Sequence, residues 1–133
     1  MPIRLESGVA STFNARVLIV DDEALFAELM GRSLSAEGGI EVVGVASDGE
    51  AAVEMANDLK PDAILMDIEL PGSIDGIEAA VQIKRTQPET GVMILSSHSD
   101  RRYVTSLPIQ EIPGWAYLLK QTVPDLRTLI RAI

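Results

Sequence analysis

Short apolar runs alternate along most of the chain with stretches that are apolar on one side only. Each run is about as long as a typical strand and is rich in Val, Ile and Leu, which is typical of strands buried on both faces of a parallel sheet. Pro, Gly or Asp residues bound most of the runs. The pattern predicts strands at residues 16–20, 40–46, 63–67, 91–95 and 115–119.

The stretches between these strands carry apolar residues at helical spacing. After the first strand, Leu25, Leu29, Met30 and Leu34 recur at this spacing before Gly38-Gly39, which predicts a helix that ends at the glycines. Pro108 and Pro113 allow only a short or irregular helix in the fourth stretch. The predicted helices cover residues 23–37, 49–59, 77–87, 100–112 and 122–133.

Five alternations of strand and helix favour an α/β domain. We expect a flavodoxin-like, doubly wound, five-stranded parallel sheet of order 2-1-3-4-5, with right-handed crossovers and helices on both faces. Residues 1–15 lack periodicity and are expected to form a flexible tail, which leaves the folded domain at 16–133.

The balance of acidic and basic residues indicates which kinds of molecule the protein can bind. Twenty acidic and eleven basic residues give a net charge of −9, which disfavours direct binding of nucleic acid and suits divalent cations or basic protein surfaces. A charge that only keeps the protein soluble explains this balance equally well. No apolar run approaches the roughly 20 residues of a membrane helix, and no secretory signal is visible. The absence of Cys excludes thiolate metal sites and fits a cytoplasmic location.

Four of the five predicted strands end in chemically useful residues: Asp21-Asp22, Asp67, Ser96 and Lys120. Parallel strands align their carboxyl ends along one edge, and the order 2-1-3-4-5 makes the first and third strands neighbours, so these side chains should meet. Crowded carboxylates repel, and Mg²⁺ relieves the repulsion. Asp67 would then act as a nucleophile that forms an aspartyl-phosphate, with Lys120 neutralising phosphoryl oxygens and Ser96 donating a hydrogen bond.

An ordered set of short motifs resembles the receiver domain of bacterial two-component response regulators over about residues 16–133. Asp-Gly-Ile-Glu-Ala-Ala from residue 75, and Gln121 where Pro often follows the Lys, lean toward receivers with a LuxR-type DNA-binding output. The matching motifs are Val20-Asp21-Asp22-Glu23, Met66–Gly72, Asp75-Gly76, Leu95-Ser96-Ser97 and Tyr117-Leu118-Leu119-Lys120.

The resemblance implies roles for individual residues at the acidic site. Asp67 would accept a phosphoryl group from a histidine of a sensor kinase. Asp22, Asp67 and the main-chain carbonyl of Glu69 would hold Mg²⁺, and Asp21 would lie mostly behind these direct ligands.

Further roles implied by the resemblance concern switching and the lifetime of the phosphoryl group. Ser96 and Tyr117 match the family's switch pair, in which the hydroxyl moves toward the phosphoryl group and the aromatic ring follows inward. Glu69 and His98 lie two residues past Asp67 and Ser96, at places where the family tunes dephosphorylation. A lone His without Cys or His partners is otherwise an ordinary loop residue and poor evidence for zinc.

The expected partners are a sensor histidine kinase, a C-terminal DNA-binding output domain that this chain lacks, and a second copy in a homodimer. Two departures from the family pattern bear on these partners. The loop between Pro71 and Gly76 is one residue longer than usual, and Pro108 and Pro113 shorten a helix that receivers commonly use to dimerise.

Other functions fit parts of the same pattern. A phosphohydrolase of the haloacid-dehalogenase kind would use Asp67 as nucleophile and Glu69 as acid, but it normally carries its acidic pair on the first strand. A flavodoxin-like binder of a nucleotide or flavin phosphate wants a Gly-, Ser- or Thr-rich loop after the first strand, where Asp21-Asp22-Glu23 carries the opposite charge. Taken singly, Asp22 is also a good helix N-cap and Lys120 an ordinary solvated charge.

Overall fold

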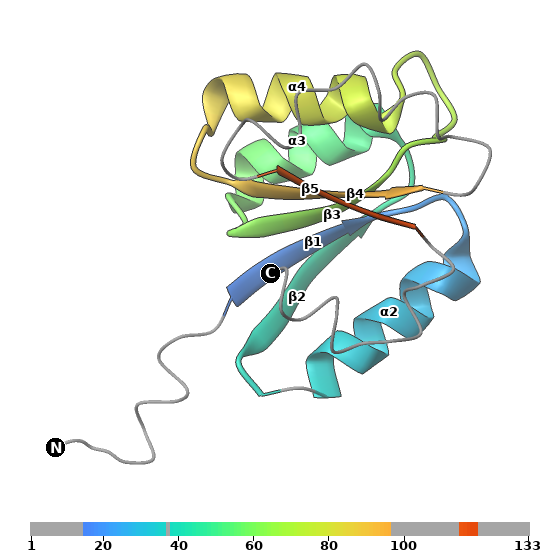
Figure 1. Ribbon diagram of the computed structural model, residues 1–133, viewed down its shortest axis with the longest axis vertical. Coiled ribbons are helices and arrows are strands. Elements are labelled where there is room, and N and C mark those ends of the chain that lie inside the picture. The colour runs from blue at the N-terminus through green and yellow to red at the C-terminus, as the bar shows by residue number, and fades with distance from the viewer. Residues whose placement is uncertain (1–14, 37, 97–114, 120–133) are drawn as a thin grey trace, which may run out of the picture.

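The computed structural model describes residues 15–36, 38–96 and 115–119. These residues form a parallel five-stranded sheet of order β2-β1-β3-β4-β5, as predicted (Figure 1). The order reverses between β1 and β3, so their carboxyl ends lie side by side. The strands are β1 (Ala15–Val20), β2 (Ile40–Ala46), β3 (Ala63–Asp67), β4 (Gly91–Ser96) and β5 (Trp115–Leu119).

Helices cover both faces of this sheet. Helix α2 (Ala24–Ala36) lies on one face, and α3 (Gly49–Leu59) and α4 (Gly76–Thr86) lie side by side on the other (Figure 1). The helices predicted at 100–112 and 122–133 fall outside the described residues. None of the helices in the described part of the chain has the length and apolar character needed to cross a membrane.

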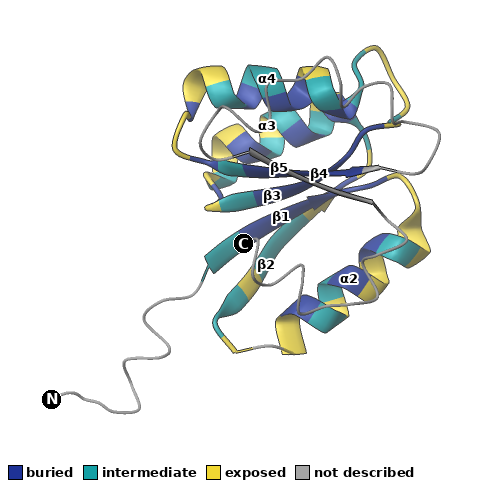
Figure 2. Cartoon of the chain, in the orientation of Figure 1, coloured by how far each residue is buried: buried dark blue, intermediate teal, exposed yellow. Residues whose placement is uncertain are grey.

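The sheet is apolar on both faces because successive residues of a strand point to opposite sides. On the side of α3 and α4, Leu18, Ile64 and Ile94 are fully buried against small helix residues such as Ala52 and Ala79. On the side of α2, the neighbouring strand residues are equally buried (Figure 2). The buried strand residues on that second face are Val17, Ile19, Leu65, Met93 and Leu95.

Helix α2 buries a different set of residues from the one that its leucine spacing suggests. Ala27, Met30 and Leu34 are buried, whereas Leu25 and Leu29 are 83% and 62% exposed. The spacing therefore predicted the helix correctly, but two of the four residues that define the spacing, Leu25 and Leu29, lie outside the core. The small side chain of Ala27, which the leucine spacing does not include, lies on the buried face of the helix instead.

The amino ends of the strands form the edge of the sheet opposite to the acidic residues. There Arg16 donates from Nη1 to the carbonyls of Leu59 and Lys60, at 2.8 and 3.1 Å, where α3 ends. Lys60 closes this helix in the left-handed conformation, with a φ of 48°. Buried Gln87 donates from Nε2 to the Ala56 carbonyl at 2.9 Å. These bonds tie α3 to β1 and to the end of α4.

The two kinds of leucine on α2 give a matched test of this packing. Leu34→Ala should lower the free energy of unfolding by about 2–5 kcal/mol, because it empties a fully buried site. Leu25→Ala should change it by less than about 0.5 kcal/mol, because that side chain is exposed. Urea denaturation followed by circular dichroism measures both, and similar losses in the two variants would contradict the assigned faces of α2.

Candidate functional site

The carboxyl ends of β1 and β3 bring acidic residues together. Val20 pairs with Met66 at the last described level of this ladder, so Asp21 and Asp67 are the next residue on each strand. Asp21 donates its amide to the Ala46 carbonyl at the end of β2, at 3.0 Å, and Asp67 pairs with Leu95 of β4. The backbone of both aspartates is therefore fixed by the sheet.

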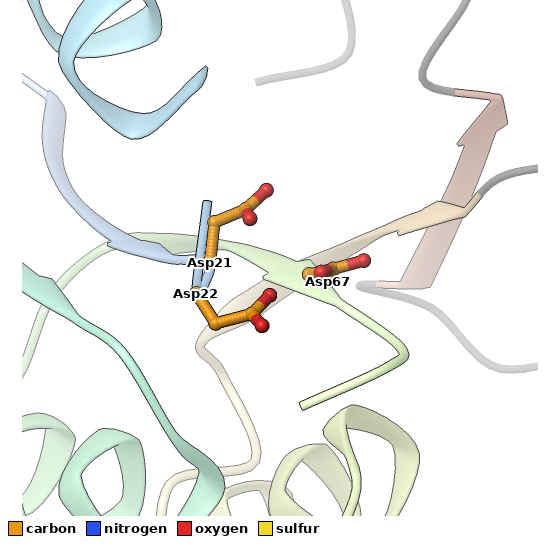
Figure 3. Close-up of side chains that lie close together, drawn as sticks. All are labelled: Asp21, Asp22 and Asp67. Atoms are coloured by element: carbon orange, nitrogen blue, oxygen red, sulfur yellow. The ribbon is translucent and has the colours of Figure 1, made fainter. Parts of the chain in front are cut away.

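The side chains of Asp21, Asp22 and Asp67 converge at this edge. Each offers a carboxylate oxygen, and these oxygens lie within 4.8 Å of one another (Figure 3). Asp21 and Asp67 are only 2% and 5% exposed, while Asp22 is open to solvent. The Asp21 Oδ1 accepts the amide of Glu23 at 2.8 Å. Like charges held this close, and largely away from water, call for a cation between them.

The donor set defines which cation fits. Three carboxylates supply only hard oxygen ligands, which suit Mg²⁺ or Ca²⁺ rather than a metal that prefers nitrogen or sulfur. The exposed side of the cluster at Asp22 leaves room for water or for an incoming anionic group. The arrangement matches the acidic pocket that the sequence predicted from Asp21, Asp22 and Asp67.

The loop that follows Asp67 returns to the same place. Ile68, 1% exposed, donates its amide to the Leu95 carbonyl at 3.2 Å, and its own carbonyl accepts the amide of Gly76 at 2.8 Å. A Cβ placed on Gly76 would lie 1.8 Å from the Asp67 carbonyl oxygen. Only glycine lets the start of α4 lie this close to the backbone of Asp67.

The sequence predicted a turn-rich loop through Gly76 and a helix from residue 77. In the structure Asp75 is the N-cap, since its side chain accepts the Glu78 amide at 2.8 Å, and α4 begins at Gly76. The role of Gly76 in packing against Asp67 was missed, because a contact between backbones leaves no signal in the sequence beyond the glycine itself.

The other predicted site residues belong to β4, β5 and the segments after them. Ser96 is the last residue of β4 and pairs with Leu119, the last residue of β5. Two residues earlier on each strand, Tyr117 pairs with Ile94. Because β5 runs parallel to β4, its carboxyl end lies on the same edge as Asp67.

Some predicted residues are not tested by these contacts. His98 and Lys120 lie outside the described residues, and the roles of Ser96 and Tyr117 as a switch pair stay predictions. Glu69 is exposed and follows Ile68 directly in the loop.

A doubly wound sheet with three carboxylates where β1 and β3 end is the arrangement that a receiver domain is expected to have. The chain belongs to the response regulator receiver domain family, whose profile matches residues 17–131. This membership confirms the family that the motifs indicated, and it gives no support to the phosphohydrolase alternative.

Individual relatives agree with this assignment. The chain is 40% identical over 118 residues to the transcriptional regulatory protein DegU of Brevibacillus brevis, covering 89% of this chain and 48% of that protein. It resembles the response regulator domain of Thermotoga maritima CheB, with a TM-score of 0.74 and 34% identity over 89% of this chain and 94% of that one. A LuxR-family two-component response regulator from Aurantimonas sp. SI85-9A1 gives a TM-score of 0.76 and 28% identity over 90% and 84%.

The chain spans about half the length of the curated relatives it matches first. The comparisons therefore establish the receiver domain, and the activity of a longer protein is a separate question.

The contact between Gly76 and Asp67 can be tested by substitution. Gly76→Ala should lower the free energy of unfolding by about 1–3 kcal/mol or more, because the new methyl group must displace the backbone of β3 or α4. Gly38→Ala is the control, since a Cβ there meets nothing within 4 Å. Chemical denaturation measures both variants, and equal stability would contradict the close approach.

Proposed function

We propose that this domain takes a phosphoryl group from a sensor kinase histidine onto Asp67, in a Mg²⁺-dependent reaction, and thereby switches a surface near β5. The observation that carries the proposal is the cluster of Asp21, Asp22 and Asp67, whose carboxylate oxygens lie within 4.8 Å of one another in a receiver-family chain. Asp67 is the central member, because it ends the buried strand β3 between two neighbouring strands.

The residues that would hold Mg²⁺ are Asp22, Asp67 and the main-chain carbonyl of Glu69. Asp21 would lie behind them, which agrees with its burial and with the amide of Glu23 that its Oδ1 accepts. A bound Mg²⁺ would supply positive charge that offsets the carboxylates and the oxygens of an incoming phosphoryl group.

In the transfer step, a carboxylate oxygen of Asp67 attacks phosphorus. A P–O bond forms, the P–N bond to the kinase histidine breaks, and its electron pair leaves with the imidazole. Lys120 would offset charge on the phosphoryl oxygens, and the Ser96 hydroxyl would donate a hydrogen bond to one of them. Such a reaction needs positioning and charge stabilisation more than acid–base chemistry. The domain would catalyse only its own phosphorylation and dephosphorylation.

The output of the switch would pass through Ser96 and Tyr117. Phosphorylation adds about −1.5 to −2 units of charge at Asp67, which would bias a two-state arrangement of the hydroxyl and the aromatic ring. These residues belong to β4 and β5, the two strands on one side of β3. The surface around β5 is therefore the proposed output face, and it is also a candidate face for a homodimer.

The wider context that we propose is a cytoplasmic transcription regulator of the LuxR type. DegU is a transcriptional regulatory protein, the similar Aurantimonas regulator is of the LuxR family, and the chain covers only 48% of DegU. A C-terminal DNA-binding domain in the full protein would fit this coverage. Contact with DNA would fall to that domain, because this chain carries a net charge of −9.

The main test is phosphorylation of the protein by a small donor. Incubation with Mg²⁺ and acetyl phosphate should add one phosphoryl group, detected by intact mass spectrometry. Asp67→Asn and removal of Mg²⁺ by a chelator should both abolish the gain. Asp58→Asn, an exposed position on α3, should leave it intact. No gain in the wild type, or multiple turnovers of a phosphomonoester, would contradict the proposal.

A second test concerns the lifetime of the phosphoryl group. Replacing Glu69 or His98 by Ala should change the decay rate several-fold, because both residues are expected to border the path of the attacking water. The decay is followed by intact mass after the donor is removed. Decay at the wild-type rate in both variants would show that neither residue influences the lifetime of the phosphoryl group.

A further inference from the structure

The tip of the loop between β3 and α4 is held by a residue from another element. Glu50, in the first turn of α3, accepts the amide of Ser73 on Oε2 at 3.1 Å, and the same oxygen accepts the Ser73 hydroxyl. We call Glu50, Gly72 and Ser73 the loop clasp. It joins residues 23 positions apart in the sequence.

The shape of the backbone makes room for this contact. Gly72 has a φ of 101°, and a Cβ there would lie 2.7 Å from Oε1 of Glu50. On the other side, a Cβ on Gly49 would lie 2.6 Å from Cγ1 and 2.9 Å from the carbonyl oxygen of Ile74. Gly72 leaves room for the Glu50 carboxylate, and Gly49 lets the start of α3 lie against the loop backbone at Ile74.

The carboxylate of the clasp is in its charged form at neutral pH. The hydrogen bond from the Ser73 hydroxyl, followed by those from the backbone amides of Glu50 and Ser73, lowers the pKa of Glu50 below the ordinary value. Hydrogen bonds to an ionised acceptor are stronger than those between neutral groups. The clasp therefore restrains the loop although it is exposed to water.

The restrained loop carries one of the expected metal ligands. It leaves the sheet at Asp67, passes through Glu69 and returns at Gly76, whose amide donates to Ile68. Both ends of the loop are thus fixed at the site, and the clasp fixes the tip between them. A main-chain ligand on an unrestrained loop would lose conformational entropy when an ion binds, and prior restraint removes that loss.

We propose that Glu50 is a positioning residue for the metal site, because the clasp holds the loop with the Glu69 carbonyl in the binding arrangement before Mg²⁺ arrives. This inference rests on the proposed function for the identity of the ligands. It adds a residue that touches neither the ion nor the phosphoryl group.

The test is a double-mutant cycle of Glu50→Ala and Ser73→Ala, with Mg²⁺ binding measured by isothermal titration calorimetry. Each single variant should weaken the affinity for Mg²⁺ by about three- to tenfold, the loss expected for a typical net hydrogen bond. The double variant should bind no more weakly than Glu50→Ala, because Glu50→Ala already removes both hydrogen bonds and Ser73→Ala removes only the one from the hydroxyl. In the ion-free protein, amide hydrogen exchange at residue 73 should become faster in the two variants that lack Glu50, because they lose the acceptor of that amide.

Glu54→Ala is the matched control, since it removes the same charge from an exposed position further along α3. It should leave both the affinity and the exchange at the wild-type level. A loss of affinity equal to that of Glu50→Ala would show a general effect of charge and would overturn the clasp.

The clasp and the proposed function fail in different ways. If acetyl phosphate modifies the wild type but all clasp variants bind Mg²⁺ with wild-type affinity, the clasp is wrong and the function stands. If the variants bind Mg²⁺ more weakly but the wild type is never phosphorylated, the clasp stands and the function is wrong.

Discussion

The parallel direction of β1 and β3 forces the carboxylates at their ends together. Sheet hydrogen bonds and two apolar layers fix both strands, so the backbones of Asp21 and Asp67 cannot separate without disturbing the core. Two charges 4 Å apart repel by about 4 kcal/mol at the effective dielectric near a protein surface. A divalent cation bound between the carboxylates would offset this repulsion, and the same strands that form the core hold the carboxylates in place.

The residues on either side of Asp67 in the chain are fully buried. Met66 and Ile68 are at most 1% exposed, and Asp67 between them is 5% exposed. The nucleophile proposed here is thus anchored by its neighbours in the chain, by the ladder to β4 and by the close approach of Gly76. The loop that follows it is held at its ends by Ile68 and Gly76 and at its tip by Glu50. A rigidly held carboxylate suits the proposed role of Asp67 as the acceptor of a phosphoryl group.

Much of this arrangement could be predicted from the sequence because its causes are local. Apolar runs gave the strands, the alternation with helices gave the topology, and the aspartates after two neighbouring strands gave the acidic cluster. Spacing alone could not assign the buried face of α2, where Ala27 is inside and Leu25 outside. The contact between Glu50 and Ser73 could not be predicted from the sequence either, because it joins two polar residues 23 positions apart that belong to no periodic pattern.

A main-chain ligand changes how such a site can be tuned. Substituting Glu69 would replace its side chain but leave its carbonyl, the proposed metal ligand, in place, so the position of that carbonyl depends on the path of the loop. The path is fixed near the sheet by Ile68 and Gly76, which serve the core as well and tolerate little change. The tip is exposed, and its contact with Glu50 involves no core residue. Metal affinity could therefore vary between related domains through the clasp while the carboxylates and the fold stay the same.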